Sequence, residues 1–434
     1  MKRLTLMVAL LFIVTAGLFS QNERIAGLKK HVEVLTSDSL MGRGAGSEGE
    51  RMAARYIERV FAGAEIELLY PSPGQDFSFV NSEGDTLKSQ NIIGIVEGYD
   101  PQLKNEFILV AAHYDHLGRV NVKIDGKDST LLYRGADDNA SGTSVMLEVA
   151  KMIRARSFMF KRSVLFAAFG AEERGMIGSW YFLNRAFGQK DKISLMVNLD
   201  MVGRGGEGRQ LYVYTMMPHA ELSTLLKDVS DKPLMPEPTI KASSYFPSDH
   251  QVFAAEGIPV ALFTTGLHRD YHTTRDVESE IDYLSMDMTT EYVFNLVLDA
   301  ANMGRMLTKT AFAPKESIED EVGKPRIYKQ EQTETPALFL HGREQRFLDR
   351  WVYKYLKYPQ GAVERGVSGR VIVEFTVDYD GKVKDVVVIK SLDYELDEAA
   401  IKTVEASPDW KPAKIDGKPV SVRIALPVEF RLKR

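Results

Sequence analysis

Five short segments rich in histidine and carboxylate side chains constrain this chain more than any other feature. Each lies beside an apolar run or a glycine-rich turn, and in chain order they read HYDH (His113–His116), GADDNASG (Gly135–Gly142), FGAEERG (Phe169–Gly175), NLDMVGR (Asn198–Arg204) and YHTTRD (Tyr271–Asp276). Divalent ions such as zinc bind this mixture of imidazole nitrogen and carboxylate oxygen. One segment could occur by chance, but all of them in this order predict a two-metal hydrolase site.

The apolar runs around these segments predict an α/β domain. Short β-rich runs bounded by turns are the expected strands, at residues 91–96, 107–112, 163–169, 195–199, 211–214 and 260–263. Helical spacing of apolar residues predicts helices over Ile25–Phe61, Gly142–Arg154 and Glu291–Met306, with a capping box at Ser47 and Glu50. Apolar strands that alternate with helices are typical of a sheet buried on both faces.

A second pattern occupies the end of the chain. Pro, Lys, Glu, Gln and Thr dominate residues 308–336, which predicts a linker. The elements expected after it are a hairpin of strands Gly369–Val377 and Lys382–Lys390, a helix over Leu392–Val404 and a strand over Val420–Leu432. The sequence therefore predicts a small, separate α+β domain over residues 337–434.

Composition and the first residues set further bounds. The chain has 434 residues, enough for two or three domains, and its net charge of −5 argues against binding of nucleic acid. It contains no cysteine, which excludes disulfides and thiolate metal ligands. Lys2 and Arg3 precede the apolar run Leu4–Phe19, so residues 1–20 are expected to be a signal peptide. An uncleaved membrane anchor is the alternative, although the run is shorter than the ~20 residues of a usual span.

The first two polar segments supply candidate ligands, and the second of them allows two interpretations. His113 ends an expected strand, where open α/β sheets place ligand sites, and Asp115 could orient its imidazole. Asp137 and Asp138 lie in a turn before a helix. They could simply cap that helix, or one of them could bridge two cations and relieve their repulsion.

The remaining segments supply further candidate ligands. Glu172 and Glu173 could begin a solvated helix, or one could bind metal while the other acts as a general base. Asp200 follows an apolar run, where a carboxylate is rarely left unpaired. His272 can complete a second metal shell. His250 and His268 lie near these segments in sequence, and polar support or specificity contacts are expected of them in preference to metal binding.

These motifs make residues 28–306, approximately, resemble the co-catalytic di-zinc peptidases. This family includes secreted bacterial leucyl aminopeptidases, glutamate carboxypeptidases and glutaminyl cyclases. The resemblance extends to SDHQVFAAEGIP (Ser248–Pro259). It implies a zinc exopeptidase domain over residues 21–307. That domain would have three α/β/α layers around a mixed central sheet.

The resemblance also implies two zinc ions per chain and assigns their ligands. One ion would be held by His113, Asp138 and Asp200, and the other by Asp138, Glu173 and His272, with Asp138 as the bridge. Glu172 would be the general base, and Tyr271 could hydrogen-bond the developing oxyanion. Asp115 would support the site, and Asp137 would be a neighbour instead of a ligand.

Hydrolysis of peptide substrates follows from this resemblance. Two metals would lower the pKa of a shared water, and Glu172 would pass its proton to the leaving amine. An aminopeptidase that removes N-terminal residues is the favoured interpretation. A carboxypeptidase stays open, since Arg204, Arg269 and Arg275 lie near ligand motifs and could hold a terminal carboxylate. A glutaminyl cyclase is less favoured, because that relative works with one zinc.

Residues 347–432 resemble the C-terminal domain of TonB energy transducers. The motifs that carry the resemblance are YP (Tyr358–Pro359), GRVIVEFTVDYDGKV (Gly369–Val383), LDEAAIK (Leu396–Lys402), WKPAK (Trp410–Lys414) and LPVEFRL (Leu426–Leu432). The resemblance implies strand addition to extended peptides, a possible outer-membrane or periplasmic protein partner, and a place in the periplasm or cell envelope of a Gram-negative bacterium.

The long Pro-rich spacer of TonB is missing, so recruitment, dimerisation or substrate presentation is expected in place of energy transduction. A TonB-like binding protein with a non-catalytic peptidase domain is the alternative from another functional class. The presence of Glu172 and of every expected ligand argues against that alternative.

Overall fold

The computed structural model describes residues 21–432 apart from residues 72–73, 81–84, 125–126, 207, 244–246, 310–326, 331–332, 341, 365, 391 and 416. The expected signal peptide and the central part of the expected linker lie outside the described residues. Two compact units are present, one mainly before residue 313 and one mainly after it. Among the described residues, no helix combines the length and the apolar character needed to cross a membrane.

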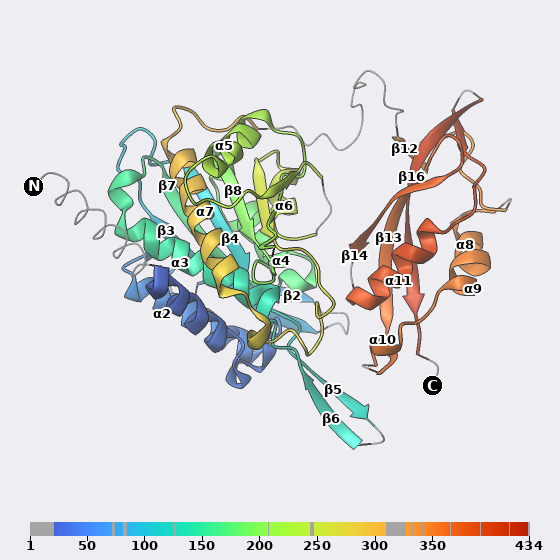
Figure 1. The fold of residues 1–434 in the computed structure, drawn as a ribbon, viewed down its shortest axis with the longest axis horizontal. Helices are drawn as coiled ribbons and strands as arrows, with labels where there is room; N and C mark the ends of the chain where they lie inside the picture. Colours follow the sequence, from blue (N-terminus) through green and yellow to red (C-terminus); the bar gives the residue numbers. More distant parts are fainter. Residues whose placement is uncertain are drawn as a thin grey trace, which may run out of the picture. The chain divides into compact units, whose positions relative to one another are not determined.

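A mixed sheet forms the centre of the first unit (Figure 1). Its order is β1-β3-β7-β4-β8-β11-β9-β10, with β2 paired to β3. The strands are β1 (Glu67–Leu68), β2 (Gln75–Val80), β3 (Thr86–Val96), β4 (Phe107–His113), β7 (Ser163–Phe169), β8 (Ile193–Leu199), β9 (Tyr212–Tyr214), β10 (Thr239–Lys241) and β11 (Val260–Thr264). β4, β7, β8 and β11 are parallel, whereas β3 and β9 run antiparallel to their neighbours β7 and β11. A hairpin of β5 (Arg119–Ile124) and β6 (Lys127–Leu132) stands apart from this sheet.

Helices cover both faces of the sheet. One face packs against α2 (Glu48–Gly63), α3 (Gly142–Ala155), α5 (Ala220–Ser230) and α7 (Tyr283–Asn302), and the other against α6 (His250–Ala255) and the short turn Phe182–Ala186 that follows α4 (Ile177–Tyr181). Alternate residues of β4 enter the two cores: Ile108 and Val110 face the first, Leu109 and Ala111 the second. This alternation explains why the central strands are apolar throughout. The predicted three-layer architecture with a mixed sheet is confirmed.

The expected single helix over residues 25–61 is wrong. Residues 21–35 and α2 are helical, but a short 3-10 segment, Asp38–Arg43, separates them. Met41 and Arg43 within it have φ of 50° and 52°, which a continuous right-handed helix does not allow. Ser47 caps α2 by accepting from the Glu50 N–H at 3.2 Å, as predicted. The buried Glu50 carboxylate, however, accepts from Gly46 and Ser89.

Helix α7 begins earlier than its apolar spacing indicated. It starts at Tyr283, where the Asp282 carboxylate accepts hydrogen bonds from the N–H groups of Leu284 and Ser285 at 3.1 Å each. It ends at Asn302 and not at Met306. The capping aspartate sets the start of the helix more strongly than the apolar spacing does.

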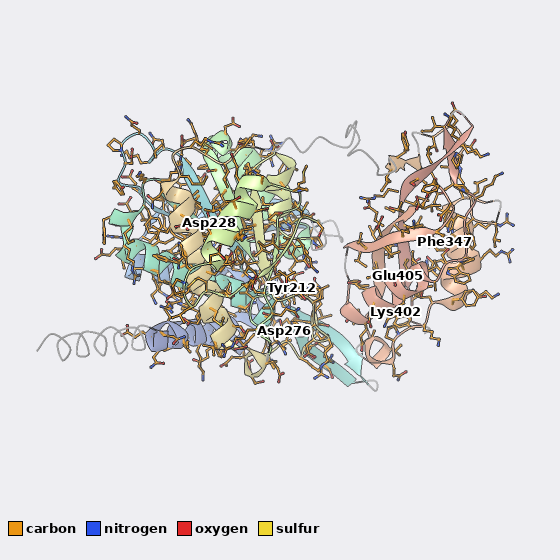
Figure 2. All side chains as sticks on the ribbon, turned by 45° about the horizontal axis from the view of Figure 1, so that its top comes forward. Tyr212, Asp228, Asp276, Phe347, Lys402 and Glu405 are labelled. Atoms are coloured by element: carbon orange, nitrogen blue, oxygen red, sulfur yellow. The ribbon has the colours of Figure 1, made fainter. Side chains whose placement is uncertain are left out.

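The second unit is a separate sheet of order β12-β16-β13-β14, with β15 also paired to β16. Its elements are β12 (Ile327–Lys329), α8 (Glu344–Phe347), α9 (Tyr353–Tyr355), α10 (Gln360–Glu364), β13 (Gly369–Val377), β14 (Val383–Lys390), α11 (Tyr394–Glu405), β15 (Ala413–Ile415) and β16 (Lys418–Phe430). Phe347, labelled in Figure 2, packs with Trp410 and Phe375 in its core. The predicted α+β pattern is confirmed, but β12 arises from residues expected to be linker.

Candidate metal centre

The carboxyl ends of the parallel strands bring the polar segments together, as expected for an open α/β sheet. His113 is the last residue of β4, Glu172 and Glu173 follow β7, Asp200 follows β8, His272 lies in the loop after β11, and Asp138 lies in the turn Ala136–Ser141 before α3. Sequence-distant residues thus meet at one edge of the sheet.

A first cluster contains His113, Asp138 and Asp200. His113 Nε2 lies 3.3 Å from Asp138 Oδ1 and 3.5 Å from Asp200 Oδ1. All three side chains are buried. The structure therefore assembles the set of residues that the resemblance assigned to one metal ion.

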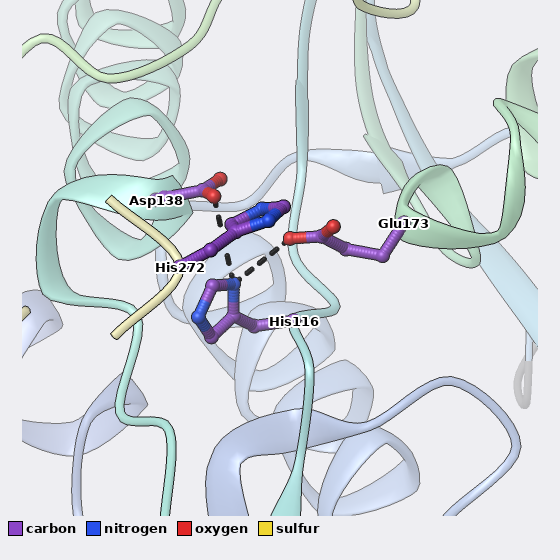
Figure 3. Close-up of side chains that lie close together, drawn as sticks. All are labelled: His116, Asp138, Glu173 and His272. Atoms are coloured by element: carbon purple, nitrogen blue, oxygen red, sulfur yellow. Dashed lines mark hydrogen bonds and ion pairs between the residues drawn. The ribbon is translucent and has the colours of Figure 1, made fainter. Parts of the chain in front are cut away.

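A second cluster contains Asp138, Glu173, His272 and one further histidine, His116 (Figure 3). One ligand atom from each lies within 4.8 Å of the others. His116 Nδ1 lies 2.9 Å from Glu173 Oε1 and 3.7 Å from Asp138 Oδ2. Asp138 thus directs Oδ1 to the first cluster and Oδ2 to the second.

The donor set and its spacing fit divalent metal ions. Bonds of about 2.0–2.2 Å to a tetrahedral zinc ion place neighbouring ligand atoms about 3.3–3.6 Å apart. The distances within the two clusters scatter around this value. Several buried carboxylates so close together would repel one another strongly without cations between them.

The Asp115 carboxylate forms hydrogen bonds with the backbone of the two glutamates. It accepts from the N–H groups of Glu172 and Glu173, at 3.0 and 3.3 Å. His113 Nδ1 lies 3.2 Å from the backbone carbonyl oxygen of Asp115 but 3.8 Å from its carboxylate. The Asp115 carboxylate thus fixes the loop after β7 and also lies within ion-pair distance of the His113 imidazole, so its role in orienting that ring stays a prediction.

Asp276 fixes the turn that carries Asp138. Its carboxylate accepts from the N–H of Asp137 at 2.9 Å and from the N–H of Asp138 at 3.0 Å. Asp276 is fully buried and is labelled in Figure 2. Asp137 Oδ1 accepts from the Gly203 N–H at 2.6 Å, so its carboxylate serves the fold and stays out of both clusters. The sequence segment YHTTRD contained Asp276, but nothing in the sequence indicated its partner.

The Glu172 carboxyl lies in a strongly perturbed environment. Burial raises its pKa well above the ordinary value, and the neighbouring carboxylates of Asp249, Glu173 and Asp200 raise it further, against the imidazole of His113. Burial also raises the pKa of Asp249 to about 6. The positive charge of a bound metal ion would oppose both shifts, because it favours the ionised carboxylate. Asp249 belongs to the segment SDHQVFAAEGIP, but sequence reasoning gave it no role.

A buried cation holds the loops beneath these clusters. The Arg43 guanidinium is fully buried and donates to the backbone oxygens of Tyr114 and Arg134 at 2.8 Å each and of Gly135 at 3.0 Å. Burial lowers its pKa to about 10, and the charges of Asp115 and other site carboxylates oppose this shift. Sequence analysis missed Arg43, because its partners are backbone atoms distant in the chain.

Three further aromatic residues near the ligand motifs have distinct environments. The Tyr271 ring stacks on the His272 ring, with centroids 3.8 Å apart and planes at 21°. His268 Nδ1 accepts from the Asp270 N–H at 3.2 Å. His250 is fully buried at the start of α6, and neither ring nitrogen has a hydrogen-bond partner among the described residues. Neither His250 nor His268 belongs to a cluster in the described part of the chain.

Two family models match this sequence. Residues 91–297 match peptidase family M28, and residues 354–432 match the Gram-negative bacterial TonB protein C-terminal family. Aminopeptidase YwaD of Bacillus subtilis (strain 168) is 39% identical over 131 residues, which are 30% of this chain and 25% of that protein. Leupeptin-inactivating enzyme 1 of Streptomyces exfoliatus is 30% identical over 185 residues, 42% of this chain and 37% of that protein. The match spans well under two thirds of the length of either relative.

Solved structures share the fold of the first unit. A zinc aminopeptidase from Bacillus subtilis, BSAP, has a TM-score of 0.53 at 18% identity, over 64% of this chain and 95% of that chain. An aminopeptidase from Aneurinibacillus sp. strain AM-1 has a TM-score of 0.51 at 19% identity, over 66% of this chain and 96% of that chain. The resemblance predicted from the motifs is therefore confirmed: the chain combines a domain that matches peptidase family M28 with a domain that matches the TonB C-terminal family.

Proposed function

We propose that this protein is a zinc-dependent metallo-exopeptidase, and specifically an aminopeptidase that removes N-terminal residues from peptides. One observation carries the proposal: the two carboxylate oxygens of Asp138 face two separate ligand clusters. A shared carboxylate lets two cations lie about 3.5–4 Å apart despite their repulsion. The relatives support the substrate class, since YwaD is an aminopeptidase and BSAP a zinc aminopeptidase.

Two zinc ions would be held, one by each cluster, with Asp138 common to both. Zinc supplies Lewis acidity, which lowers the pKa of a water molecule and polarises a carbonyl group. Glu172 accepts the proton of the attacking water and delivers it to the leaving amine. Asp115 holds the Glu172 backbone in place for this transfer. The Tyr271 hydroxyl donates a hydrogen bond to the oxyanion that develops on the peptide carbonyl.

The surroundings of Arg204 speak against one of the three cations that a carboxypeptidase could use, the other two being Arg269 and Arg275. A carboxypeptidase needs a cation to bind the terminal carboxylate of its substrate. The Arg204 guanidinium already lies 3.3 Å from Glu280 and 3.8 Å from Asp276. A glutaminyl cyclase needs one zinc, whereas the residues of both clusters are assembled here.

We also propose that the protein is exported and acts in the periplasm or cell envelope of a Gram-negative bacterium. The apolar run Leu4–Phe19 after Lys2 and Arg3 supports export, and the match to the TonB C-terminal family supports the envelope location. Mass spectrometry of the protein from periplasmic extract should find Gln21 as the first residue. Recovery of the full-length chain in the membrane fraction would favour an uncleaved anchor instead.

The activity is tested with purified, zinc-loaded protein and three kinds of peptide. Peptides with a free N-terminus should be shortened from that end, whereas N-acetylated peptides should resist. Peptides that begin with glutamine should lose that residue instead of forming pyroglutamate. Release of C-terminal residues from N-acetylated peptides would support the carboxypeptidase and refute the proposal.

The bridging assignment is tested by replacing Asp138. The Asp138→Asn protein should lose the ability to hold two zinc ions, because both clusters share this carboxylate. Zinc per chain is measured by inductively coupled plasma mass spectrometry after dialysis. Asp137→Asn is the matched control, since that neighbouring carboxylate bonds to Gly203, and it should keep two zinc ions. Two zinc ions and unchanged activity in the Asp138 variant would show that the bridge is assigned incorrectly.

A further inference from the structure

The second cluster contains one more side chain than the resemblance supplied. His116 lies just beyond β4, where a bridge to Gly44 and a hydrogen bond from its N–H to the Arg43 carbonyl, at 3.1 Å, hold its backbone. Its side chain is buried completely. The imidazole therefore has a fixed position and not the freedom of a surface histidine.

The Nδ1 atom of His116 lies where a metal ligand would lie. Its distances of 2.9 Å to Glu173 Oε1 and 3.7 Å to Asp138 Oδ2 bracket the spacing expected of two ligands on one zinc ion. In the first cluster, the corresponding distances from His113 Nε2 are 3.3 and 3.5 Å. Both imidazoles thus stand in the same relation to Asp138, one beside each of its oxygens.

The surrounding backbone leaves space for this ring. Gly135 has φ of 56°, and a Cβ atom there would come within 2.6 Å of His116 Cγ and Cδ2. The Gly135 carbonyl is held in turn by the Arg43 guanidinium at 3.0 Å. A larger residue at position 135 would collide with this ring and with the Asp138 carbonyl oxygen. Glycine at this position therefore serves both the His116 ring and the turn that carries Asp138.

We propose that His116, through Nδ1, is a fourth protein ligand of the ion held by Asp138, Glu173 and His272. This rests on the proposed function only in requiring zinc at the site. One cluster then offers four protein ligands and is closed, while the other, with His113 and two carboxylates, keeps a position open. A fourth protein ligand would strengthen zinc binding at this cluster, and the cluster with His113 would keep a position for water or substrate.

Two substitutions distinguish two roles of His116. In one role it binds zinc, and in the other it only donates a hydrogen bond that positions Glu173. His116→Asn keeps an N–H donor near Nδ1 but offers no imidazole nitrogen to zinc. His116→Asp offers a carboxylate ligand but cannot donate to Glu173. Zinc dissociation constants for both sites are measured by competition with a chromophoric chelator. The cobalt-loaded proteins are compared by visible absorption, which reports coordination number.

If His116 is a ligand, His116→Asn should weaken zinc affinity at one site by at least about 10²-fold. Loss of a hydrogen bond that only supports a ligand weakens metal affinity by about 10²-fold at most. His116→Asp should recover most of that affinity. Wild-type affinity in the Asn variant, or weaker binding in the Asp variant than in the Asn variant, overturns the proposal. Melting in EDTA shows whether each variant folds, and His31→Gln, at a buried histidine outside both clusters, is the control for loss of a buried imidazole.

If the variants do not fold, the wild-type chain still decides the matter. In protein labelled with ¹⁵N-histidine and loaded with ¹¹³Cd, three imidazoles should couple to cadmium, those of His113, His116 and His272. Coupling of only two overturns the proposal. None of these measurements depends on catalysis. An inactive protein with the expected zinc affinities would therefore refute the proposed peptidase function but support His116 as a ligand. An active protein whose zinc affinities do not change on substitution of His116 would support the peptidase function and refute His116 as a ligand.

Discussion

Glu172 is the residue on which the proposed chemistry depends most. Glu172→Gln keeps the size of the side chain but removes the proton acceptor, so kcat should fall at least ~10²-fold while zinc content stays at the wild-type level. Steady-state kinetics and metal analysis on the same preparation check this. Glu173→Gln is the contrasting variant, since loss of a ligand should reduce zinc content first. Near-normal turnover of a zinc-replete Glu172 variant would move the base to another residue.

His250 makes stability depend on acidity. Burial lowers its pKa to about 3, whereas the unfolded chain takes up the proton near pH 6.5. The stability that this neutral imidazole allows is therefore present above pH 6.5 and is lost as pH falls towards 3. The linkage relation predicts that His250 lowers the free energy of unfolding by about 2 kcal/mol between pH 7 and pH 5.

Urea unfolding of metal-free wild type and His250→Leu at both pH values isolates this contribution, because the buried carboxyls with raised pKa shift stability in the opposite direction in both proteins. His250→Leu cannot bind the proton, so its free energy of unfolding should fall less over the same interval, by about 2 kcal/mol. His219→Leu is the control, because that imidazole is hydrogen-bonded to Thr308 and caps α5. Parallel pH curves for wild type and His250→Leu would show that His250 titrates normally.

Site residues at the ends of strands could be predicted from the sequence. A residue whose position depends on contacts with distant parts of the chain could not. His113 and Asp200 could be chosen because each ends or follows an apolar run, and parallel strands bring such positions together. His116 stood in the same HYDH motif but gave no signal of its own. Its place depends on the bridge to Gly44 and the space at Gly135, which are separated from it in the chain.

Among the elements, the long strands and helices followed from their patterns, while breaks between them did not. β13 has the expected bounds, because its side chains alternate between core and surface. The interruption between residues 35 and 48 was missed, since its apolar residues continue the helical spacing. The glycines at positions 42, 44 and 46 were the available signal, and two of them have positive φ.

Strand β12 offers a prediction about the C-terminal sheet. It pairs in parallel with β16, with Ile327, Tyr328 and Lys329 opposite Ser421, Val422 and Arg423. Tyr328→Pro removes an N–H and disfavours the ladder, so amides along this part of β16 should exchange hydrogen faster. Hydrogen exchange with mass spectrometry checks this, and Tyr328→Thr, which retains strand propensity, should leave exchange nearly unchanged. Equal protection in all three proteins would mean that the pairing is not formed in solution.

At the scale of the molecule, every residue of the two clusters lies at or before His272 in the chain, ahead of the segment near residue 313. A chain ending near Ala311 should therefore fold, bind two zinc ions and hydrolyse small aminoacyl substrates at close to the full-length rate. Melting with and without chelator, zinc analysis and kinetics check the fragment. Loss of activity in a folded, zinc-loaded fragment would mean that the C-terminal unit completes the active site.

The C-terminal unit begins earlier in the chain than the composition of the linker indicated. A piece that begins at Pro336 lacks β12, although β12 belongs to the C-terminal sheet. A fragment that begins before Ile327 should melt at a higher temperature than one that begins at Pro336, and neither should respond to chelator. The same melting temperature for both would show that β12 adds nothing to the stability of the unit.

Strand β12 also changes how the C-terminal unit would meet an extended peptide. A guest strand that pairs with β16 at Ser421, Val422 and Arg423 would find these residues already paired with β12, which competes for them in every molecule. The observed dissociation constant would then be the intrinsic one divided by the fraction of molecules in which β12 is detached. A ladder of three residues is a weak competitor, so a modest change in its pairing would alter affinity several-fold without any change in the guest. The opposite edge, β14, carries no such competitor among the described residues.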